Sequence, residues 1–268
     1  MALYLHIPFC RRKCHYCDFP SFPGRPADFG PYLAALKEEL RRRWRREWEI
    51  TTLYLGGGTP TILPSRELAG LIKAIKRTVP FRPGAEVTVE ANPGTVTGEG
   101  LDRLLAAGVN RLSLGAQSGE DRFLKLLGRC HTTAEVEKTV ALARQVGFTN
   151  LNLDLIFGLP GETPDDWRRT LEWATALHPE HLSCYGLQLE ADTPLFRMVE
   201  TGERSLPDEE EVRAMFLTNT TFLPTAGYEQ YEISNFAYRP RTGTGTTSPE
   251  GEVDYRCRHN LIYWQYDD

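Results

Sequence analysis

The chain opens with residues 1–17, Met-Ala-Leu-Tyr-Leu-His-Ile-Pro-Phe-Cys-Arg-Arg-Lys-Cys-His-Tyr-Cys, in which an apolar strand pattern runs into a loop with three cysteines. Cys10, Cys14 and Cys17 have the spacing Cys-x3-Cys-x2-Cys. A cubane iron–sulfur cluster normally takes four cysteine ligands, and reactive metal sites keep an open position where structural sites are closed. Three ligands in one tight loop therefore predict a 4Fe–4S cluster whose remaining iron is open to another molecule.

Two other interpretations of this loop stay open at the level of sequence. Zinc prefers a closed tetrahedron of four ligands, and His6 or His15 could complete one, which would make the chain a barrel with a purely structural metal. Free thiols are the other alternative. The remaining cysteines, Cys130, Cys184 and Cys257, are widely scattered and are expected to be small buried hydrophobic side chains.

Short β-rich stretches alternate with longer amphipathic stretches beyond the loop. We expect strands at Ala2–Pro8, Thr51–Leu55, Glu86–Ala91, Arg111–Ala116, Asn150–Phe157 and His181–Leu189. We expect helices at Phe29–Trp48, Ser65–Val79, Gly98–Ala107, Glu120–Leu127, Ala134–Val146, Asp165–His178 and Pro207–Leu223. Thr163 with Pro164 signals one helix start, and Gly108 and Gly147 signal helix ends. This alternation predicts an α/β fold, an open, partial parallel (β/α)6 barrel rather than the closed eight-fold form.

The composition changes after Phe236, which divides the chain into a barrel core at residues 1–236 and an extension at residues 237–268. The extension contains Thr242-Gly-Thr-Gly-Thr-Thr-Ser-Pro249, which has nothing to bury and is expected to be a flexible linker. An aromatic-rich stretch follows from Tyr255 and is expected to pack against another surface. We also expect the chain to be truncated at Asp268.

The bulk composition narrows the possible functions. The formal net charge of −5 lacks the basic excess of a nucleic-acid-binding protein, and the Arg41–Arg46 run has the spacing of a solvated helix face. No apolar run approaches the ~20 residues of a transmembrane helix, and the first residues do not match a secretory signal. We therefore expect a cytoplasmic protein that binds no nucleic acid.

Glycines and polar residues stand where the expected strands end. Gly56-Gly-Gly-Thr59 follows one strand, and Glu90 and Gln117 end the next two. Asp154 lies within an apolar strand, where a carboxylate needs a partner, and Arg129 can grip a carboxylate with its planar fork. Ligands of parallel α/β folds gather at the carboxyl ends of strands. Each of these residues on its own could contact a ligand at this end of the sheet or could form a structural ion pair.

The chain resembles the radical S-adenosylmethionine superfamily, and more closely the oxygen-independent coproporphyrinogen III oxidase family, in Tyr4-Leu-His-Ile-Pro-Phe-Cys10, Cys14-His-Tyr-Cys-Asp-Phe19 and Gly56-Gly-Gly-Thr-Pro-Thr61. The resemblance implies that the three cysteines hold a 4Fe–4S cluster and that S-adenosylmethionine chelates the open iron. It implies that an electron from a flavodoxin-type or ferredoxin-type donor passes through the cluster and cleaves a carbon–sulfur bond to give a 5′-deoxyadenosyl radical. The positions that match S-adenosylmethionine contacts in the family are Tyr4, Gly57, Gly58, Thr59, Glu90, Gln117, Arg129 and Asp154. For His6, a site role and a core role are both open.

One departure separates two branches of that family. Members with oxidase chemistry carry a further cysteine two residues after the third ligand, where this chain has Phe19. The Cys-Asp-Phe run and the motif His259-Asn-Leu-Ile-Tyr-Trp264 resemble instead the heme chaperone branch, HemW. That resemblance implies heme binding with His259 as an axial ligand, with Cys257 as a possible second ligand, and transfer of heme to an acceptor protein. No catalytic residue is assigned. The alternatives are a coproporphyrinogen III oxidase of porphyrin biosynthesis and a structural zinc barrel.

Overall fold

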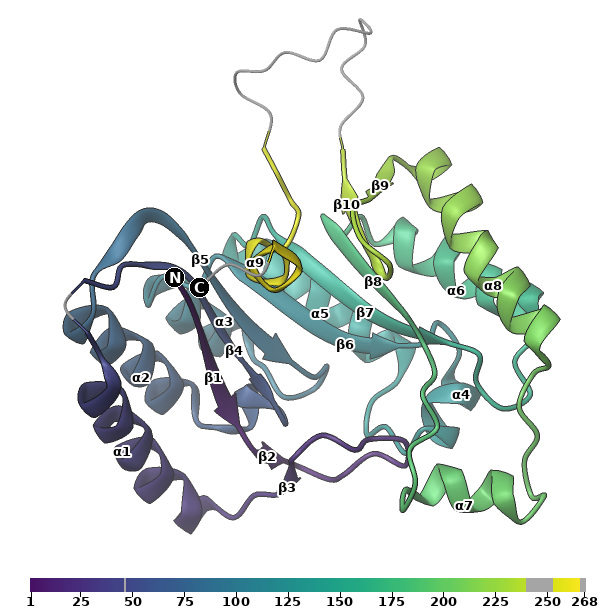
Figure 1. Cartoon of the computed structure of the whole chain (residues 1–268), viewed down its shortest axis with the longest axis horizontal. Coiled ribbons are helices and arrows are strands. Elements are labelled where there is room, and N and C mark those ends of the chain that lie inside the picture. The colour runs from purple at the N-terminus through teal and green to yellow at the C-terminus, as the bar shows by residue number, and fades with distance from the viewer. Residues whose placement is uncertain (46, 240–252, 266–268) are drawn as a thin grey trace, which may run out of the picture.

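The computed structural model describes residues 1–45, 47–239 and 253–265 and shows a curved sheet with helices packed along one face (Figure 1). The strands are β1 (Ala2–Ile7), β2 (Phe9–Cys10), β3 (Phe22–Pro23), β4 (Ile50–Gly57), β5 (Phe81–Ala91), β6 (Arg111–Gln117), β7 (Leu151–Phe157), β8 (His181–Gly186), β9 (Tyr228–Gln230) and β10 (Asn235–Tyr238). The α-helices are α1 (Pro26–Arg43), α2 (Ser65–Thr78), α3 (Gly98–Ala106), α4 (Asp121–Leu126), α5 (Thr133–Val146), α6 (Pro164–Ala176), α7 (Pro194–Glu200), α8 (Glu209–Phe222) and α9 (Arg258–Gln265), with short 3-10 helices η1 (Pro60–Ile62) and η2 (Leu223–Ala226).

Six parallel strands form the core of the sheet in the order β1-β4-β5-β6-β7-β8. Beyond β8, strands β10 and β9 extend the sheet in antiparallel fashion. In the described part of the chain β1 and β9 are the two edges of this sheet and do not pair with each other. The expected open, six-unit parallel barrel is therefore confirmed, and the two antiparallel strands are an addition to it.

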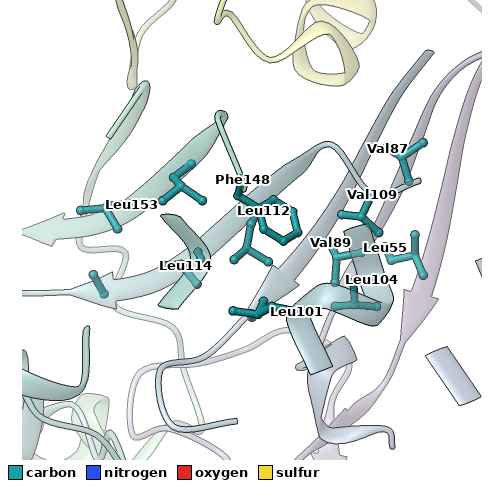
Figure 2. Close-up of a cluster of buried hydrophobic side chains, with 14 of the residues drawn as sticks. Leu55, Val87, Val89, Leu101, Leu104, Val109, Leu112, Leu114, Phe148 and Leu153 are labelled. Carbon is teal, nitrogen blue, oxygen red and sulfur yellow. The ribbon is translucent and has the colours of Figure 1, made fainter. Parts of the chain in front are cut away.

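The convex face of the sheet carries the hydrophobic core. Side chains alternate between the two faces of a strand, so Leu112 and Leu114 of β6 point the same way as Val87 and Val89 of β5 (Figure 2). They share one buried cluster with Phe148, which stands just before β7. Helices cover this face, and burial of its leucines and valines contributes about 25 cal/mol for each Å² of apolar surface removed from water.

The same alternation makes the concave face polar. The residues between the apolar ones are Thr52, Tyr54, Glu86, Thr88, Glu90, Arg111, Ser113, Asn152, Asp154, His181 and Ser183. A polar face of this kind cannot serve as a dry core, because each buried polar group needs a hydrogen-bond partner. The inside of the barrel is therefore built to hold a polar network or a ligand.

Several helix ends lie where the sequence signals predict them. Thr163 begins α6 with a capping box that it shares with Asp166, and Gly147 ends α5 in the left-handed region at φ 110°. Other boundaries differ. Helix α1 begins at Pro26, since proline suits the first helical turn, and it ends at Arg43 rather than Trp48. Helix α8 begins at Glu209, two residues later than expected, because Asp208 caps it.

The elements that were not expected from the sequence are β2, β3, η1, α7, η2, β9, β10 and α9. Strand β8 ends at Gly186 instead of Leu189. The expected linker 242–249 lies outside the described residues. The expected boundary at 236 falls inside β10, and the division into 1–236 and 237–268 stays a prediction. Helix α9 lies in front of the sheet, near the starts of its strands (Figure 1). Within the described ranges, no helix is long and apolar enough to cross a membrane.

Candidate functional site

The cysteine loop leaves the carboxyl end of β1 and is held by backbone hydrogen bonds. Phe22 N–H donates to the Pro8 carbonyl at 2.9 Å, and Gly24 N–H donates to the Cys10 carbonyl at 2.9 Å. These bonds form the small β2–β3 ladder. Within the loop, Cys17 N–H donates to the Cys14 carbonyl at 3.3 Å. The backbone therefore fixes all three cysteines on one compact turn.

The histidines proposed as zinc ligands have both ring nitrogens engaged elsewhere. The His6 ring pairs with the Tyr4 hydroxyl at 3.1 Å and with the Pro20 carbonyl at 2.8 Å. The His15 ring pairs with the Leu126 carbonyl at 2.9 Å and with Arg12 at 3.1 Å. Neither imidazole is free to complete a zinc tetrahedron.

The three thiols suit a cluster better than a single ion. Cys10 is buried, and Cys14 and Cys17 are half-buried. Burial raises the pKa of Cys17, and the neighbouring Cys14 and Cys10 raise it further. Across the described residues, no group of three His, Cys, Asp or Glu side chains lies close enough together to hold one metal ion. In a cubane each cysteine binds a different iron, so a 4Fe–4S cluster does not require the three thiols to converge on one point.

Gly57, Gly58 and Thr59 at the end of β4 pack directly against the cysteine loop. Gly58 N–H donates to the Ile7 carbonyl at 2.8 Å, and Thr59 N–H donates to the Phe9 carbonyl at 2.8 Å. A Cβ on Gly58 would lie 2.6 Å from the Phe9 carbonyl oxygen. The structure shows that Gly58 is needed for close approach of the cysteine loop. Contact of Gly57 and Gly58 with a ligand stays a prediction.

Arg129 connects the cysteine loop to the strand ends. Its Nη1 donates to Cys14 Sγ at 3.4 Å, and its Nη2 donates to the Gly115 carbonyl at 2.8 Å and to Asn92 Oδ1 at 2.5 Å. Its Nε is buried and has no acceptor among the described residues. Gln117, at the end of the same strand as Gly115, is buried at φ 70°, a left-handed conformation that is uncommon for residues other than glycine. Such strain is typical of ligand sites.

Asn92 is a site residue that the sequence reasoning missed. Its Nδ2 donates to Thr59 Oγ1 at 2.8 Å while its Oδ1 accepts from Arg129, and Thr59 in turn donates to Cys10 Sγ at 3.7 Å. Asn92 therefore joins the glycine turn, the arginine and the cysteine loop. The available signal was its position two residues after Glu90, at the end of β5.

Glu90 and Asp154 lie deeper on the concave face. Glu90 accepts from the Tyr54 hydroxyl at 2.8 Å and from Gly57 N–H at 3.2 Å. Asp154 accepts from Ser113 at 2.9 Å and from Asn152 at 2.8 Å. Asp154 therefore has the hydrogen-bond partners that we expected for a carboxylate within an apolar strand.

Comparison with known proteins decides the family. Residues 4–174 match the profile of the Radical SAM superfamily. The chain belongs to the radical SAM superfamily. Its curated relatives include heme chaperone HemW of Bacillus subtilis, 37% identical over 266 residues, and of Escherichia coli, 36% identical over 275 residues. These alignments cover 98% and 100% of this chain, and 66% and 67% of the relatives. HemW of Synechocystis is 34% identical over 270 residues, and the alignment covers 62% of that protein. The chain therefore spans about two thirds of the length of these relatives.

The most informative solved structure is an oxidase of the same superfamily. Coproporphyrinogen III oxidase (HemN) of Escherichia coli, described as a radical SAM enzyme, superposes with a TM-score of 0.81 at 31% sequence identity. The match covers 88% of this chain and 55% of that chain. Membership of the radical SAM superfamily establishes a 4Fe–4S cluster and S-adenosylmethionine as cofactors of the chain, and the cysteine loop described above fits the cluster.

The electrostatics of the radical SAM core make Glu90 sensitive to pH. Burial and the nearby charge of Asp154 raise the pKa of Glu90 to about 7, against the hydrogen bonds from Tyr54 and Gly57. Burial likewise raises the pKa of Asp154. Glu90 is therefore protonated at mildly acidic pH and ionised at mildly alkaline pH.

We predict that Glu90→Gln will flatten the pH dependence of stability. Because the folded-state pKa of about 7 lies above the ordinary value of 4.5, the native state binds more protons than the unfolded chain between these values. The free energy of unfolding of the wild type should therefore fall as the pH rises through this window. Urea denaturation at several pH values tests this, with Glu99→Gln on α3 as the exposed control. Parallel profiles for wild type and Glu90→Gln would contradict the assignment.

Helix α9 is attached to the start of the radical SAM barrel through Glu86. The Glu86 carboxylate accepts from the N–H groups of Arg258 and His259, both at 3.1 Å, and from Cys257 Sγ at 3.6 Å. A carboxylate at a helix N-terminus is stabilising, since it satisfies free N–H groups and complements the helix dipole. Cys257 is consequently buried, with its thiol against the Glu86 carboxylate.

His259 points inward from α9. Its Nδ1 pairs with Thr52 Oγ1 at 2.8 Å, its ring stacks on Tyr54 with centroids 5.0 Å apart, and its Nε2 lies 3.4 Å from the Tyr263 hydroxyl. Burial lowers the pKa of His259 to about 4. Of the scattered cysteines, Cys184 and Cys257 are buried as expected, whereas Cys130 is exposed, because it stands in the loop after α4 rather than in a strand.

Proposed function

We propose that the chain is the cofactor-binding core of a heme chaperone, which binds heme and transfers it to an acceptor protein. The observation that carries this proposal is the run Cys17-Asp18-Phe19, in which an exposed phenylalanine follows the cluster ligands. An oxidase of the same family needs a thiol there, and Phe19 has none. The near-complete coverage of the chain by proteins named heme chaperone HemW supports the same function.

We assign Cys10, Cys14 and Cys17 as the cluster ligands. S-adenosylmethionine is assigned to the concave face beside them, with contacts from Tyr4, Gly57, Gly58, Thr59, Glu90, Gln117, Arg129 and Asp154. When bound and reduced, the cluster can supply an electron to S-adenosylmethionine. The residues themselves position the ligand and balance its charges. Arg129 places a cation beside Cys14 Sγ, and Glu90 offers a carboxylate to an amine or to hydroxyl groups of the ligand.

We assign His259 as a heme ligand. Its lowered pKa of about 4 keeps the imidazole neutral at pH 7, which is the form that binds iron. Its contact with the Tyr263 hydroxyl is long at 3.4 Å, so Nε2 is weakly held. His259 lines a cavity of about 180 Å³, which is smaller than the ~300–1,000 Å³ of pockets for drug-sized ligands. Tyr4 and Tyr263 are exposed and would offer aromatic surface to the macrocycle.

Heme titration tests this function. We expect purified wild-type protein to bind one heme with a Soret band typical of histidine ligation. His259→Ala should bind at least tenfold more weakly, a loss of about 1.4 kcal/mol or more. His178→Ala removes an exposed histidine and should bind heme as the wild type does. Identical titrations for wild type and His259→Ala would remove His259 from the site, and absence of heme binding by the wild type would refute the proposal.

A second candidate function is oxygen-independent coproporphyrinogen III oxidation. The superposition on the Escherichia coli oxidase with a TM-score of 0.81 favours it, and Phe19 opposes it. An anaerobic assay with coproporphyrinogen III, S-adenosylmethionine and a reductant decides between the two. Sustained formation of protoporphyrinogen would establish the oxidase, whereas we expect none.

We further propose a cytoplasmic setting, an electron donor of the flavodoxin or ferredoxin type, and a heme acceptor that the sequence does not identify. Residues 237–268 are proposed as the start of a heme-associated region. The support for this region is that α9 presents exposed Tyr263 and Trp264.

A further inference from the structure

One wall of the cavity beside His259 lies far from the cysteine loop and carries a positive charge, that of Arg111, which the proposed function does not use. The cavity of about 180 Å³ lies between the concave face and α9, and its lining includes Arg111, Ser183, Asn235 and Asn260. Arg111 is the first residue of β6, whereas Gln117, near the cysteine loop, is the last. Six residues of strand span about 20 Å. The Arg111 end of the cavity is therefore distinct from the cluster end of the barrel.

Arg111 is a buried cation whose side chain makes no hydrogen bond or ion pair in the described part of the chain, although the negative charge of Glu86 acts on it. Its side chain is only 2% exposed, and its Nε is buried without an acceptor. The nearby carboxylates face other donors: Glu86 binds the N-terminus of α9, and Asp154 binds Ser113 and Asn152. A buried guanidinium nitrogen without a hydrogen-bond acceptor is unfavourable even when acidic groups lie nearby, so the cavity is arranged for an acceptor that comes from outside.

A second buried donor lies on the same cavity. Asn260 Nδ2, from α9, is buried, and the Asn260 side chain interacts with the Tyr231 hydroxyl. Arg111 and Asn260 come from elements separated by more than a hundred residues in sequence and yet line one cavity. An unsatisfied guanidinium nitrogen and a buried amide donor on one cavity wall favour an acceptor-rich group between them.

We propose that this cavity binds the carboxylate group of a ligand, with Arg111 as its anchor. The planar guanidinium matches a carboxylate through two parallel hydrogen bonds, and such charge-assisted bonds are the strong ones. A cavity of about 180 Å³ has room for about six waters at ~30 Å³ each, or for one short aliphatic acid. Two kinds of molecule could supply the carboxylate: a free short-chain acid or a propionate group of heme. The heme alternative rests on the proposed function.

Thermal unfolding with sodium propionate tests the site directly. At constant ionic strength, propionate should raise the Tm of wild-type protein in a saturable way, by about 3 °C at ten times its Kd. Propionamide, which has nearly the same shape and no charge, should have no effect. Arg111→Met should lose the propionate response, whereas Arg82→Met, which removes an exposed arginine paired with Glu49, should keep it. An equal response to propionamide, no response of the wild type, or a retained response in Arg111→Met would each overturn the proposal.

A second variant keeps the test decisive if Arg111→Met does not fold. Asn260→Asp places a carboxylate on the wall of the same cavity, so it should raise the Tm without ligand and abolish the propionate response. An unchanged propionate response in this variant would contradict the site.

Heme and its dimethyl ester separate the two sources of carboxylate. If the site holds a heme propionate, Arg111→Met should bind heme at least tenfold more weakly than the wild type does, and the two proteins should bind the ester equally. If the site holds a free acid, Arg111→Met should bind heme and the ester as the wild type does, while the propionate response is still lost. Either pattern supports a carboxylate site, and failure of the wild type to bind any heme would count against the proposed function alone.

Discussion

Cys14→Ser is expected to leave the anaerobically purified protein without its iron–sulfur chromophore. Two thiolates cannot hold a cubane whose remaining iron is reserved for S-adenosylmethionine, and Cys14 is the central ligand of the loop. Its sulfur also accepts a hydrogen bond from Arg129 at 3.4 Å, so the substitution removes a thiolate and its charge partner together. Iron and acid-labile sulfide should fall from about four of each per chain to near zero.

Cys130→Ser is the matched control for this experiment. Cys130 is exposed and lies next to Arg129 in sequence, so the substitution makes the same chemical change close to the site without touching a proposed ligand. It should retain full iron and sulfide. A brown chromophore with wild-type iron content in Cys14→Ser, or its loss in Cys130→Ser, would show that the ligand set is wrong.

Arg129→Met is expected to weaken S-adenosylmethionine binding while iron is retained. The substitution removes the cation that joins Cys14 Sγ, the Gly115 carbonyl and Asn92 Oδ1. Loss of one partner from a buried, hydrogen-bonded charge pair costs about 2 kcal/mol or more, which is about a 30-fold increase in Kd. Anaerobic calorimetric titration of cluster-loaded protein measures this change directly.

Lys125→Met provides the control for the loss of charge. Lys125 is an exposed residue of α4, the helix that leads into the Arg129 loop, and its substitution removes one positive charge without altering the site. Its Kd for S-adenosylmethionine should match that of the wild type. A Kd within threefold of the wild type for Arg129→Met, with normal iron content, would exclude Arg129 from the binding site.

The barrel could be predicted from the sequence because its signals are local. Strand and helix periods, the capping residue Thr163 and the helix-ending Gly147 each depend on a few neighbouring residues. The alternation of apolar and polar residues in the strands also fixes which side chains face the core and which face the cavity. These signals are sufficient for six parallel strands and for the end of the sheet at which ligands bind.

The position of α9 could not be predicted, because it depends on contacts between distant residues. The sequence identifies Glu86 only as the first residue of an expected strand. Its role in holding α9 is visible only in the structure, where the N–H groups of residues 258 and 259 donate to its carboxylate. Asn92 was missed for the same reason, since its contacts with Thr59 and Arg129 join three separate turns. Arg111 looked like an ordinary strand residue, and only its burial with an Nε that has no acceptor among the described residues marks it out.

The most direct measurement is electron paramagnetic resonance of the anaerobically purified, dithionite-reduced protein before and after addition of S-adenosylmethionine. A cubane held at three corners should give the signal of a reduced 4Fe–4S cluster, and binding of the sulfonium compound to the uncovered iron should change that signal. A protein that carries no paramagnetic iron, or a spectrum that the addition leaves unaltered, would contradict the open coordination position on which the proposed function depends.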